Sequence, residues 1–332
     1  MDEKTRRKTG NNILHMKKTV SEHASELSIQ EESLKHTIER SRIKLLEARD
    51  KRIRPLQDDK VITSWNGLVI AALAKASRAL GEPQFIVVAS RIVDFIMSAL
   101  RTPGGRLLRR YRDGDSSIPG FLEDYAFLVW GLLEMYESTF DVDYLRLAVE
   151  HNVVMIDLFW DQAGGGFFFT AEDSEEVLVR GKEVYDGALP SANSVALLNL
   201  IRIAKLTRDP DLELKASVLM DRFSEMVYAS PGSHSFFMTA VDFANGPSNE
   251  VVIVGKRGAE DTEAMLRALG ESFTPNKVVL FLPDGEIPKI TEIASFANDY
   301  VSIGGRATAY VCGDFSCHLP VTSVTEMLKL ME

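Results

Sequence analysis

Three helical segments with the same apolar pattern recur at offsets of 60 and 68 residues, and this repeat constrains the fold more than any other feature. The segments begin at Ser64, Asp124 and Ala192 and align without gaps. The aligned sets are Trp65, Tyr125 and Asn193; Leu68, Leu128 and Ala196; Val69, Val129 and Leu197; Ala72, Leu132 and Leu200; and Leu73, Leu133 and Ile201. Such spacing predicts a broad buried stripe of helical period.

Each segment is followed by the same succession of elements. A turn leads into a second helix, which we expect over residues 83–100, 142–160 and 210–229. A glycine-rich stretch follows at Gly104, Gly164 and Gly232, and the aromatic or aliphatic run after each glycine predicts a short strand. The unit is therefore an inner helix, an outer helix and a short hairpin. Its length suits a toroid of helical hairpins better than a solenoid.

Two regions lie outside the repeat. Residues 1–54 are charged and predict one helix over residues 29–52, which Ser28 and Glu31 begin with a capping-box pattern. The toroid part is expected over residues 55–247. Residues 248–332 change character, since the runs NEVVIVG, NKVVLFL and TAYVC predict strands and residues 259–272 and 321–331 predict helices. This alternation indicates a small α/β tail.

Charge and hydropathy exclude several classes of protein. The net charge is −10, which argues against nucleic acid or an anionic membrane as the main partner. No apolar run approaches the roughly 18 residues of a membrane span. The N-terminus is charged and no apolar stretch follows it, so we expect no secretory signal and a cytoplasmic location.

Polar side chains cluster where the inner helices begin. In a toroid these helix starts open on one face, so their first turns converge. The predicted catalytic residues are Glu123, Asp124 and Asp186, and the predicted substrate-binding residues are Asp58, Asp59, Trp65, Asn66, Tyr125, Tyr185 and Asn193. Carboxylates, amides and rings suit a sugar, and glycosidic chemistry uses two carboxyl groups roughly 5–9.5 Å apart. The alternative is that these acids only cap helices and complement their dipoles.

Other reactive residues give weaker signals. Arg109 and its neighbours suit a solvated strand face better than an anion clamp. Cys312 and Cys317 leave three alternatives open, namely buried thiols, a reversible redox disulfide or metal ligands. No histidine lies at the start of an inner helix, which argues against epimerase chemistry by imidazoles. We expect neither a cofactor nor a bound metal.

Five stretches resemble a known family: RPLQDDKVITSWNGL, PGFLEDYAFLVWGLLEMYE, FWDQAGGGFFFTAED, RGKEVYDGALPSANS and AYVCGDFSCHLPV. Together they are similar to the C-terminal half of the YyaL/spermatogenesis-associated protein 20 family of thioredoxin-domain-containing proteins. The resemblance implies a mainly α fold, the (α/α)6 six-hairpin toroid that is also found in N-acylglucosamine 2-epimerases and several glycosidases. It further implies a truncated member with about three of six hairpins and without the thioredoxin-like domain.

The resemblance sets the functional expectations. The first is a carbohydrate-active or sugar-binding toroid, with a glycosidase- or epimerase-like activity if it is an enzyme. The second is a non-catalytic scaffold for a thioredoxin-like protein, or an inactive remnant. The expected partners are a sugar or sugar phosphate, and either a second copy or a chain that supplies the missing hairpins.

Overall fold

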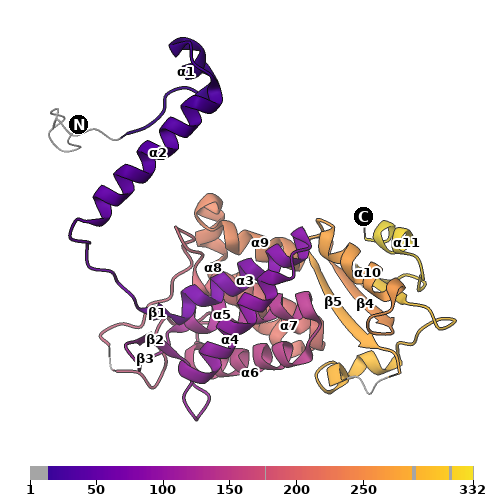
Figure 1. Cartoon of the computed structure of the whole chain (residues 1–332). Coiled ribbons are helices and arrows are strands. Elements are labelled where there is room, and N and C mark those ends of the chain that lie inside the picture. The colour runs from indigo at the N-terminus through magenta and orange to yellow at the C-terminus, as the bar shows by residue number, and fades with distance from the viewer. Residues whose placement is uncertain (1–13, 176, 286–288, 314–315, 332) are drawn as a thin grey trace. The chain divides into compact units, whose positions relative to one another are not determined.

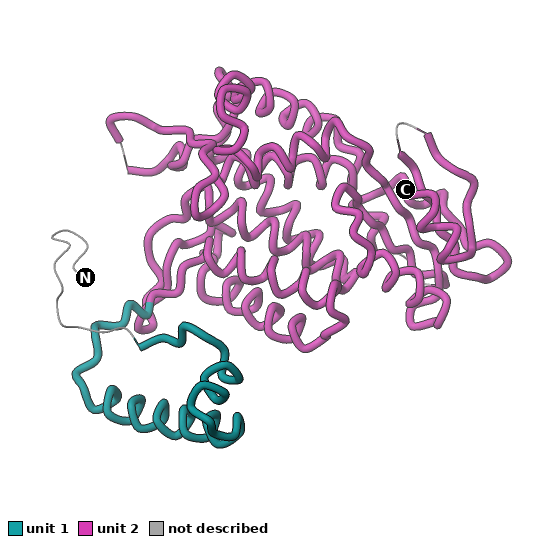
Figure 2. Tube along the Cα trace, turned by 90° about the horizontal axis from the view of Figure 1, so that it is seen from above, with its two compact units in different colours: residues 1–59 teal, residues 60–332 magenta. Residues whose placement is uncertain are grey.

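The computed structural model describes residues 14–175, 177–285, 289–313 and 316–331. Its contacts divide the chain into two compact units, residues 1–59 and residues 60–332 (Figure 2). In the described part of the first unit, helix α1 spans Val20–Leu27 and helix α2 spans Glu31–Asp50. Helix α2 confirms the helix predicted over residues 29–52, whereas α1 was missed by the prediction of one helix in residues 1–54.

The capping box predicted at Ser28 is wrong. Ser28 has a φ of 55° and ends α1 as its left-handed C-cap, while Gln30 precedes α2 without a side-chain cap. A capping box lies instead at the start of α1, where Thr19 and Glu22 bond each other's backbone amides. The Ser28 pattern is misleading because α1 ends at Ser28. A residue that forms the left-handed C-cap of one helix does not cap the start of the next helix with its side chain.

The second unit is built on paired helices, as the repeat predicts. The inner helices are α3 (Thr63–Leu80), α5 (Leu122–Thr139) and α7 (Ala192–Thr207), and the outer helices are α4 (Gln84–Ala99), α6 (Val142–Phe159) and α8 (Pro210–Ala229). Helix α5 packs between α3 and α7, and each inner helix also packs against the outer helix that follows it (Figure 1). The three predicted helical hairpins are confirmed.

The predicted glycine-linked hairpins are only partly correct. The first is present: strands β1 (Val61–Ile62), β2 (Leu108–Arg112) and β3 (Asp115–Pro119) form an antiparallel sheet in that order. Between Gly164 and α7 the described residues form no strand, and an isolated bridge joins Trp160 and Phe167. After Gly232 the strand prediction is wrong, because a short 3₁₀ turn (Pro231–Ser233) leads into helix α9 (Ser235–Asn245), which packs against α7.

The C-terminal part confirms the predicted α/β alternation. Its sheet has the order β5-β4-β6-β7, with β4 and β5 parallel and the other neighbours antiparallel. The strands are β4 (Asn249–Gly255), β5 (Lys277–Pro283), β6 (Thr308–Gly313) and β7 (Ser316–Cys317); the helices are α10 (Glu260–Glu271) and α11 (Val324–Lys329), with 3₁₀ turns at Lys289–Glu292 and Ser295–Asp299.

Alternate residues of the sheet enter two different cores. Val252 and Leu280 pack into the core of the helical hairpins, whereas Val251 and Phe281 pack into a second core with Met265 of α10. This alternation follows from the two-residue period of a strand. The sheet is thus continuous with the helical layer, and the chain is mainly helical, with 56% of the described residues in helices and 3₁₀ turns. The division into residues 1–54, 55–247 and 248–332 stays a prediction.

Candidate functional site

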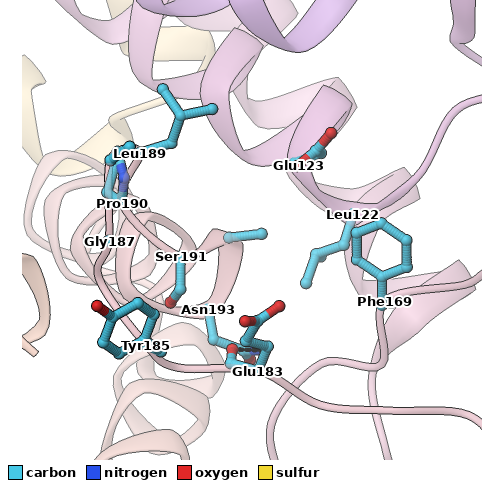
Figure 3. Close-up of a pocket in the computed structure, with 12 residues that line it drawn as sticks. Leu122, Glu123, Phe169, Glu183, Tyr185, Gly187, Leu189, Pro190, Ser191 and Asn193 are labelled. Atoms are coloured by element: carbon cyan, nitrogen blue, oxygen red, sulfur yellow. Dashed lines mark hydrogen bonds between the residues drawn. The ribbon is translucent and has the colours of Figure 1, made fainter. Parts of the chain in front are cut away.

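A cavity of about 280 Å³ lies where α5 and α7 begin (Figure 3). Two carboxylates and two aromatic rings stand among its walls. The lining residues are Leu122, Glu123, Phe169, Glu183, Tyr185, Gly187, Ala188, Leu189, Pro190, Ser191, Ala192 and Asn193. In Figure 3, Glu123, Leu122 and Phe169 lie on one side of the cavity and Tyr185, Gly187, Leu189 and Pro190 on the other.

Sequence reasoning predicted three of the lining residues and missed two with functional groups. Glu123, Tyr185 and Asn193 were expected at the helix starts, whereas Glu183 and Phe169 were not. One signal points to Glu183: it lies two residues before Tyr185, so an extended backbone places both side chains on one face. For Phe169 no comparable signal exists, because it belongs to a run of three identical aromatic residues.

An arginine from the first hairpin holds Glu123. Nη1 of Arg109, on β2, lies 2.8 Å from Oε1 of Glu123, and Oγ of Ser64 lies 3.5 Å from the same oxygen. The Arg109 guanidinium lies over the Phe121 ring at 4.9 Å, and that ring stacks on Phe169 at 4.9 Å. Arg109 therefore supports the cavity wall through Glu123 and Phe121. The sequence favours a solvated strand face for Arg109, and the structure differs from that prediction.

Asp124 joins the starts of two inner helices. It is fully buried; its Oδ1 accepts from the Ser64 amide at 2.9 Å and its Oδ2 from the Phe121 amide at 2.9 Å. Burial raises the pKa of Asp124 to about 6, while these two amides and Arg109 act in the opposite direction. These contacts are those of a helix cap. Asp124 is absent from the cavity wall, and its catalytic role stays a prediction.

Asp186 also caps helices. Its Oδ1 accepts from the Ser191 amide at 2.8 Å, just before α7. Its Oδ2 accepts from the amides of Phe236 at 2.8 Å and Phe237 at 3.0 Å, in the first turn of α9. The carboxylate thus fixes the segment that carries Tyr185 to two helix starts. A direct role of Asp186 in catalysis stays a prediction.

Tyr125 and Asn193, which the repeat places at equivalent positions, make equivalent contacts. Both are buried. Oη of Tyr125 accepts from the Leu107 amide at 2.9 Å, and Oδ1 of Asn193 accepts from the Phe167 amide at 2.9 Å. Leu107 and Phe167 are themselves 60 residues apart, so each inner helix is fastened to the glycine-rich stretch of the preceding unit. Asn193 also donates to the Glu183 carbonyl at 2.9 Å and thereby positions that part of the wall.

The remaining predicted binding residues are not among those that line the cavity. Trp65 on α3 is 59% exposed. Nδ2 of Asn66 donates to the Ile62 carbonyl at 2.8 Å, within its own helix start. Asp58 and Asp59 are exposed and belong to the first unit, so the structure does not place them against the cavity.

A disulfide joins Cys312 and Cys317, which face each other across β6 and β7. The buried-thiol alternative is therefore wrong, and a redox role stays a prediction. Within the described residues, no group of three or more histidine, cysteine or acidic side chains is placed to hold a metal ion. No helix in the described part combines the length and apolar character needed to cross a membrane.

Comparison with curated proteins identifies homologues. Human spermatogenesis-associated protein 20 is 32% identical over 333 residues, which cover 97% of this chain and 42% of the human protein. The rat protein is also 32% identical over the same share, and an uncharacterised protein of Caenorhabditis elegans is 29% identical over 96% of the chain and 44% of its own length. This chain is thus homologous to a C-terminal part of spermatogenesis-associated protein 20 and spans less than half of that length. No family model matches the sequence.

Solved structures of low sequence identity are similar in part. Cellobiose 2-epimerase from Bacillus thermoamylovorans matches with a TM-score of 0.49 and 14% identity, over 65% of this chain and 62% of the other. The GH76 α-mannanase BT2949 of Bacteroides thetaiotaomicron matches with a TM-score of 0.46 and 16% identity, over 65% and 59%.

Proposed function

We propose that the cavity at the starts of α5 and α7 binds a carbohydrate, with Glu123 and Glu183 as its acidic groups. The observation that carries this proposal is that two carboxylates and the rings of Phe169 and Tyr185 line one small cavity. Rings present flat apolar faces to the C–H groups of a sugar, and carboxylates accept hydrogen bonds from its hydroxyls. This combination favours a ligand that is polar at its edges and apolar on its faces.

The charges of the wall favour a neutral sugar over a sugar phosphate. Of the twelve described residues that line the cavity, two are acidic and none is basic. Arg109 neutralises Glu123 from behind the wall, at 2.8 Å, but lies outside the lining. A phosphate would therefore meet carboxylates without a cation at the cavity surface.

The same two carboxylates provide the groups for acid–base chemistry on a bound sugar. Glycosidic cleavage uses one protonated and one ionised carboxyl group on either side of the reacting bond. Glu123 and Glu183 come from different segments, the first turn of α5 and the loop before α7, and both line the cavity. Asp124 and Asp186 act as positioning residues in this proposal, because backbone amides already occupy their carboxylates.

Titration of the purified chain with neutral mono- and disaccharides tests the proposal. We expect saturable binding by calorimetry, weakened by about tenfold or more in Glu123→Gln, Glu183→Gln and Tyr185→Ala. Glu172→Gln and Tyr228→Ala are matched controls, since both residues are exposed and outside the cavity wall, and they should bind as the wild type does. Absence of binding for every sugar, or unchanged affinity in all three cavity variants, would contradict the proposal.

The exposed face of α3 favours a second candidate function, a module that packs against another helical hairpin. Trp65 is 59% exposed and Val69 is 45% exposed, whereas their repeat equivalents Tyr125, Val129 and Leu197 are fully buried. Among the described elements, α5 packs against two inner helices, α3 and α7, whereas α3 packs against one inner helix, α5. An apolar face of this kind is typical of an interface. The occupant that we propose is a hairpin of the same repeat, supplied by a second copy of the chain.

Light scattering over a range of protein concentrations tests this second candidate. We expect concentration-dependent association that Trp65→Ser and Val69→Ser weaken, because both changes remove apolar area from the face. Val88→Ser is the matched control, since Val88 is similarly exposed (47%) but lies on the outer helix α4. A wild-type chain that stays monomeric at every concentration would contradict self-association.

A further inference from the structure

A second cavity, of about 340 Å³, lies near the C-terminal ends of the inner helices. Helices α3, α5 and α7 meet the start of β5 there, and none of the lining residues is shared with the first cavity. Its charged lining residues are Lys75, Arg78, Arg202, Lys277, Glu134, Glu137 and Glu271. Apolar side chains complete the wall, among them Leu198, Phe243 and Phe273.

Two arginines neutralise two carboxylates of the wall, the buried Glu134 and the partly buried Glu137. Nη1 of Arg202 lies 2.7 Å from Glu134 and its Nη2 lies 2.7 Å from Glu137, while Arg78 also bonds Glu134. The indole Nε1 of Trp130 donates to Glu134 at 3.1 Å. Burial alone raises the pKa of Glu134, but the arginines more than offset it and hold that pKa far below its usual range. This network is therefore charged at neutral pH and internally balanced.

Lys277 also lines the cavity, but it makes no ion pair with the glutamates of this network. Its Nζ donates to the Thr274 carbonyl at 3.1 Å and to the Thr274 hydroxyl at 2.9 Å. Among the described residues, no carboxylate lies within ion-pair distance of its ammonium. Burial lowers the pKa of Lys277; Glu137 opposes this effect and Arg78 adds to it. The lining as a whole has four basic and three acidic groups, in a chain whose net charge is −10.

We propose that this cavity binds a small organic anion, with its carboxylate or phosphate group against Lys277. The anion supplies the counter-charge that the partly buried ammonium lacks among the described residues. Lys75, whose Nζ lies 3.6 Å from Glu134, adds a second cation at the wall. The apolar body of the ligand packs against Leu198 and Phe243, which accounts for a cavity larger than a bare oxyanion needs.

The test uses phenyl phosphate and benzoate as probes and phenol as the uncharged control. The chain has three tryptophans, so its indole N–H signals are few in a ¹⁵N spectrum, and a Trp130→Phe variant assigns the signal of Trp130. That indole bonds Glu134 at the cavity, so it reports on the site. We expect saturable shifts of the Trp130 signal with both anions and none with phenol, while Trp65 and Trp160 stay unchanged.

Lys277→Gln separates this site from nonspecific anion binding. The variant should bind phenyl phosphate at least about tenfold more weakly, because the ligand loses its cation. It should stay folded, since it removes a partly buried ammonium that has no carboxylate partner in the described part of the chain. Lys256→Gln, on an exposed turn outside the cavity, should bind as the wild type does. Absence of an anion-dependent shift in the folded wild type, or equal affinity in Lys277→Gln, would overturn the proposal.

Discussion

Nη1 of Arg109 lies 2.8 Å from Oε1 of Glu123, and this ion pair connects the first β-hairpin to the wall of the proposed sugar cavity. Arg109 is also 3.4 Å from Oδ2 of Asp124 and lies over the ring of Phe121, which stacks on Phe169. One guanidinium therefore bonds the cavity carboxylate of Glu123 and the buried carboxylate of Asp124, and it also packs on the ring of Phe121. The geometry of the cavity depends on a strand that contributes no lining residue.

The first prediction concerns Arg109→Gln. The change removes the positive charge that pairs with Glu123 and with the fully buried Asp124. We therefore expect a loss of about 1–3 kcal/mol in the free energy of unfolding. Chemical denaturation measures it. Arg110→Gln is the control, because Arg110 pairs with the exposed Asp115 and should lose less than about 0.5 kcal/mol. Equal losses in both variants would contradict a special role for Arg109.

The second prediction concerns the close packing of α3 against α5. A Cβ added at Gly131 would lie 2.8 Å from the Gly67 carbonyl oxygen, so Gly131→Ala must push the two helices apart. We expect a loss of about 1–3 kcal/mol, measured by denaturation. Gly270→Ala is the helical control: its Cβ would meet Arg78 at an ordinary 3.5 Å, and it should be neutral or stabilise by up to about 1 kcal/mol. A neutral Gly131→Ala would refute the packing argument.

The third prediction concerns acid sensitivity through His151. Its ring is 1% exposed, both ring nitrogens lack a hydrogen-bond partner among the described residues, and burial, assisted by Arg101, lowers its pKa to about 4. Between pH 6.5 and 4 the unfolded chain binds a proton at this histidine and the folded chain does not. Stability therefore falls with falling pH there, by up to roughly 3 kcal/mol. His151→Leu should make the dependence of stability on pH shallower.

Asp124 contributes to the same window with the opposite sign. Because burial raises its pKa to about 6, the folded chain holds a proton between about pH 6 and 4 that the unfolded chain has released. This group adds stability as the pH falls, so Asp124→Asn should make the pH dependence steeper. Denaturation of the wild type and both variants at pH 4.5, 5.5 and 6.5 measures the slopes. Identical slopes in all three would contradict both assignments.

The fourth prediction concerns the disulfide between Cys312 and Cys317. It closes a loop of only a few residues, so its contribution through the unfolded chain is small, about 2 kcal/mol at most. We expect the Cys312→Ser, Cys317→Ser double variant to fold with a loss within that limit. Alkylation followed by mass spectrometry should find no free thiol in the oxidised wild type and two after reduction. Two free thiols under oxidising conditions would contradict the bond.

The repeat made the helical part predictable. Apolar positions at helical spacing predict which face of a helix is buried, and residues such as Leu132 on α5 and Leu200 on α7 are fully buried as expected. On α3 the prediction is wrong in part, because Val69, at the position of the buried Val129, is 45% exposed. Strand runs such as NEVVIVG were equally clear, because a buried strand in a parallel pair is apolar throughout. Local signals of this kind need no knowledge of distant partners.

The candidate site was less predictable, because its contacts join distant parts of the chain. Asp186 looks like a cavity carboxylate from its place before α7, but its Oδ2 is taken by Phe236, 50 residues later, at the start of a helix that the glycine-rich pattern had suggested was a strand. The position of Glu183 in a loop does not reveal that the side-chain amide of Asn193 donates to its carbonyl and fixes its backbone at the cavity. Whether an acid at a helix start caps or faces a cavity depends on such tertiary partners.

Mapping a neutral sugar onto the ¹⁵N-labelled chain tests the central claim most directly. The backbone amides of Gly187, Ala188 and Leu189 lie in the wall of the proposed sugar cavity, whereas the Trp130 indole lies at the second cavity. We predict saturable shifts of the three amide signals in the wild type, lost in Tyr185→Ala and kept in Tyr228→Ala, with the Trp130 signal unmoved. Shifts that avoid the three amides, or that persist unchanged in Tyr185→Ala, would contradict the carbohydrate site.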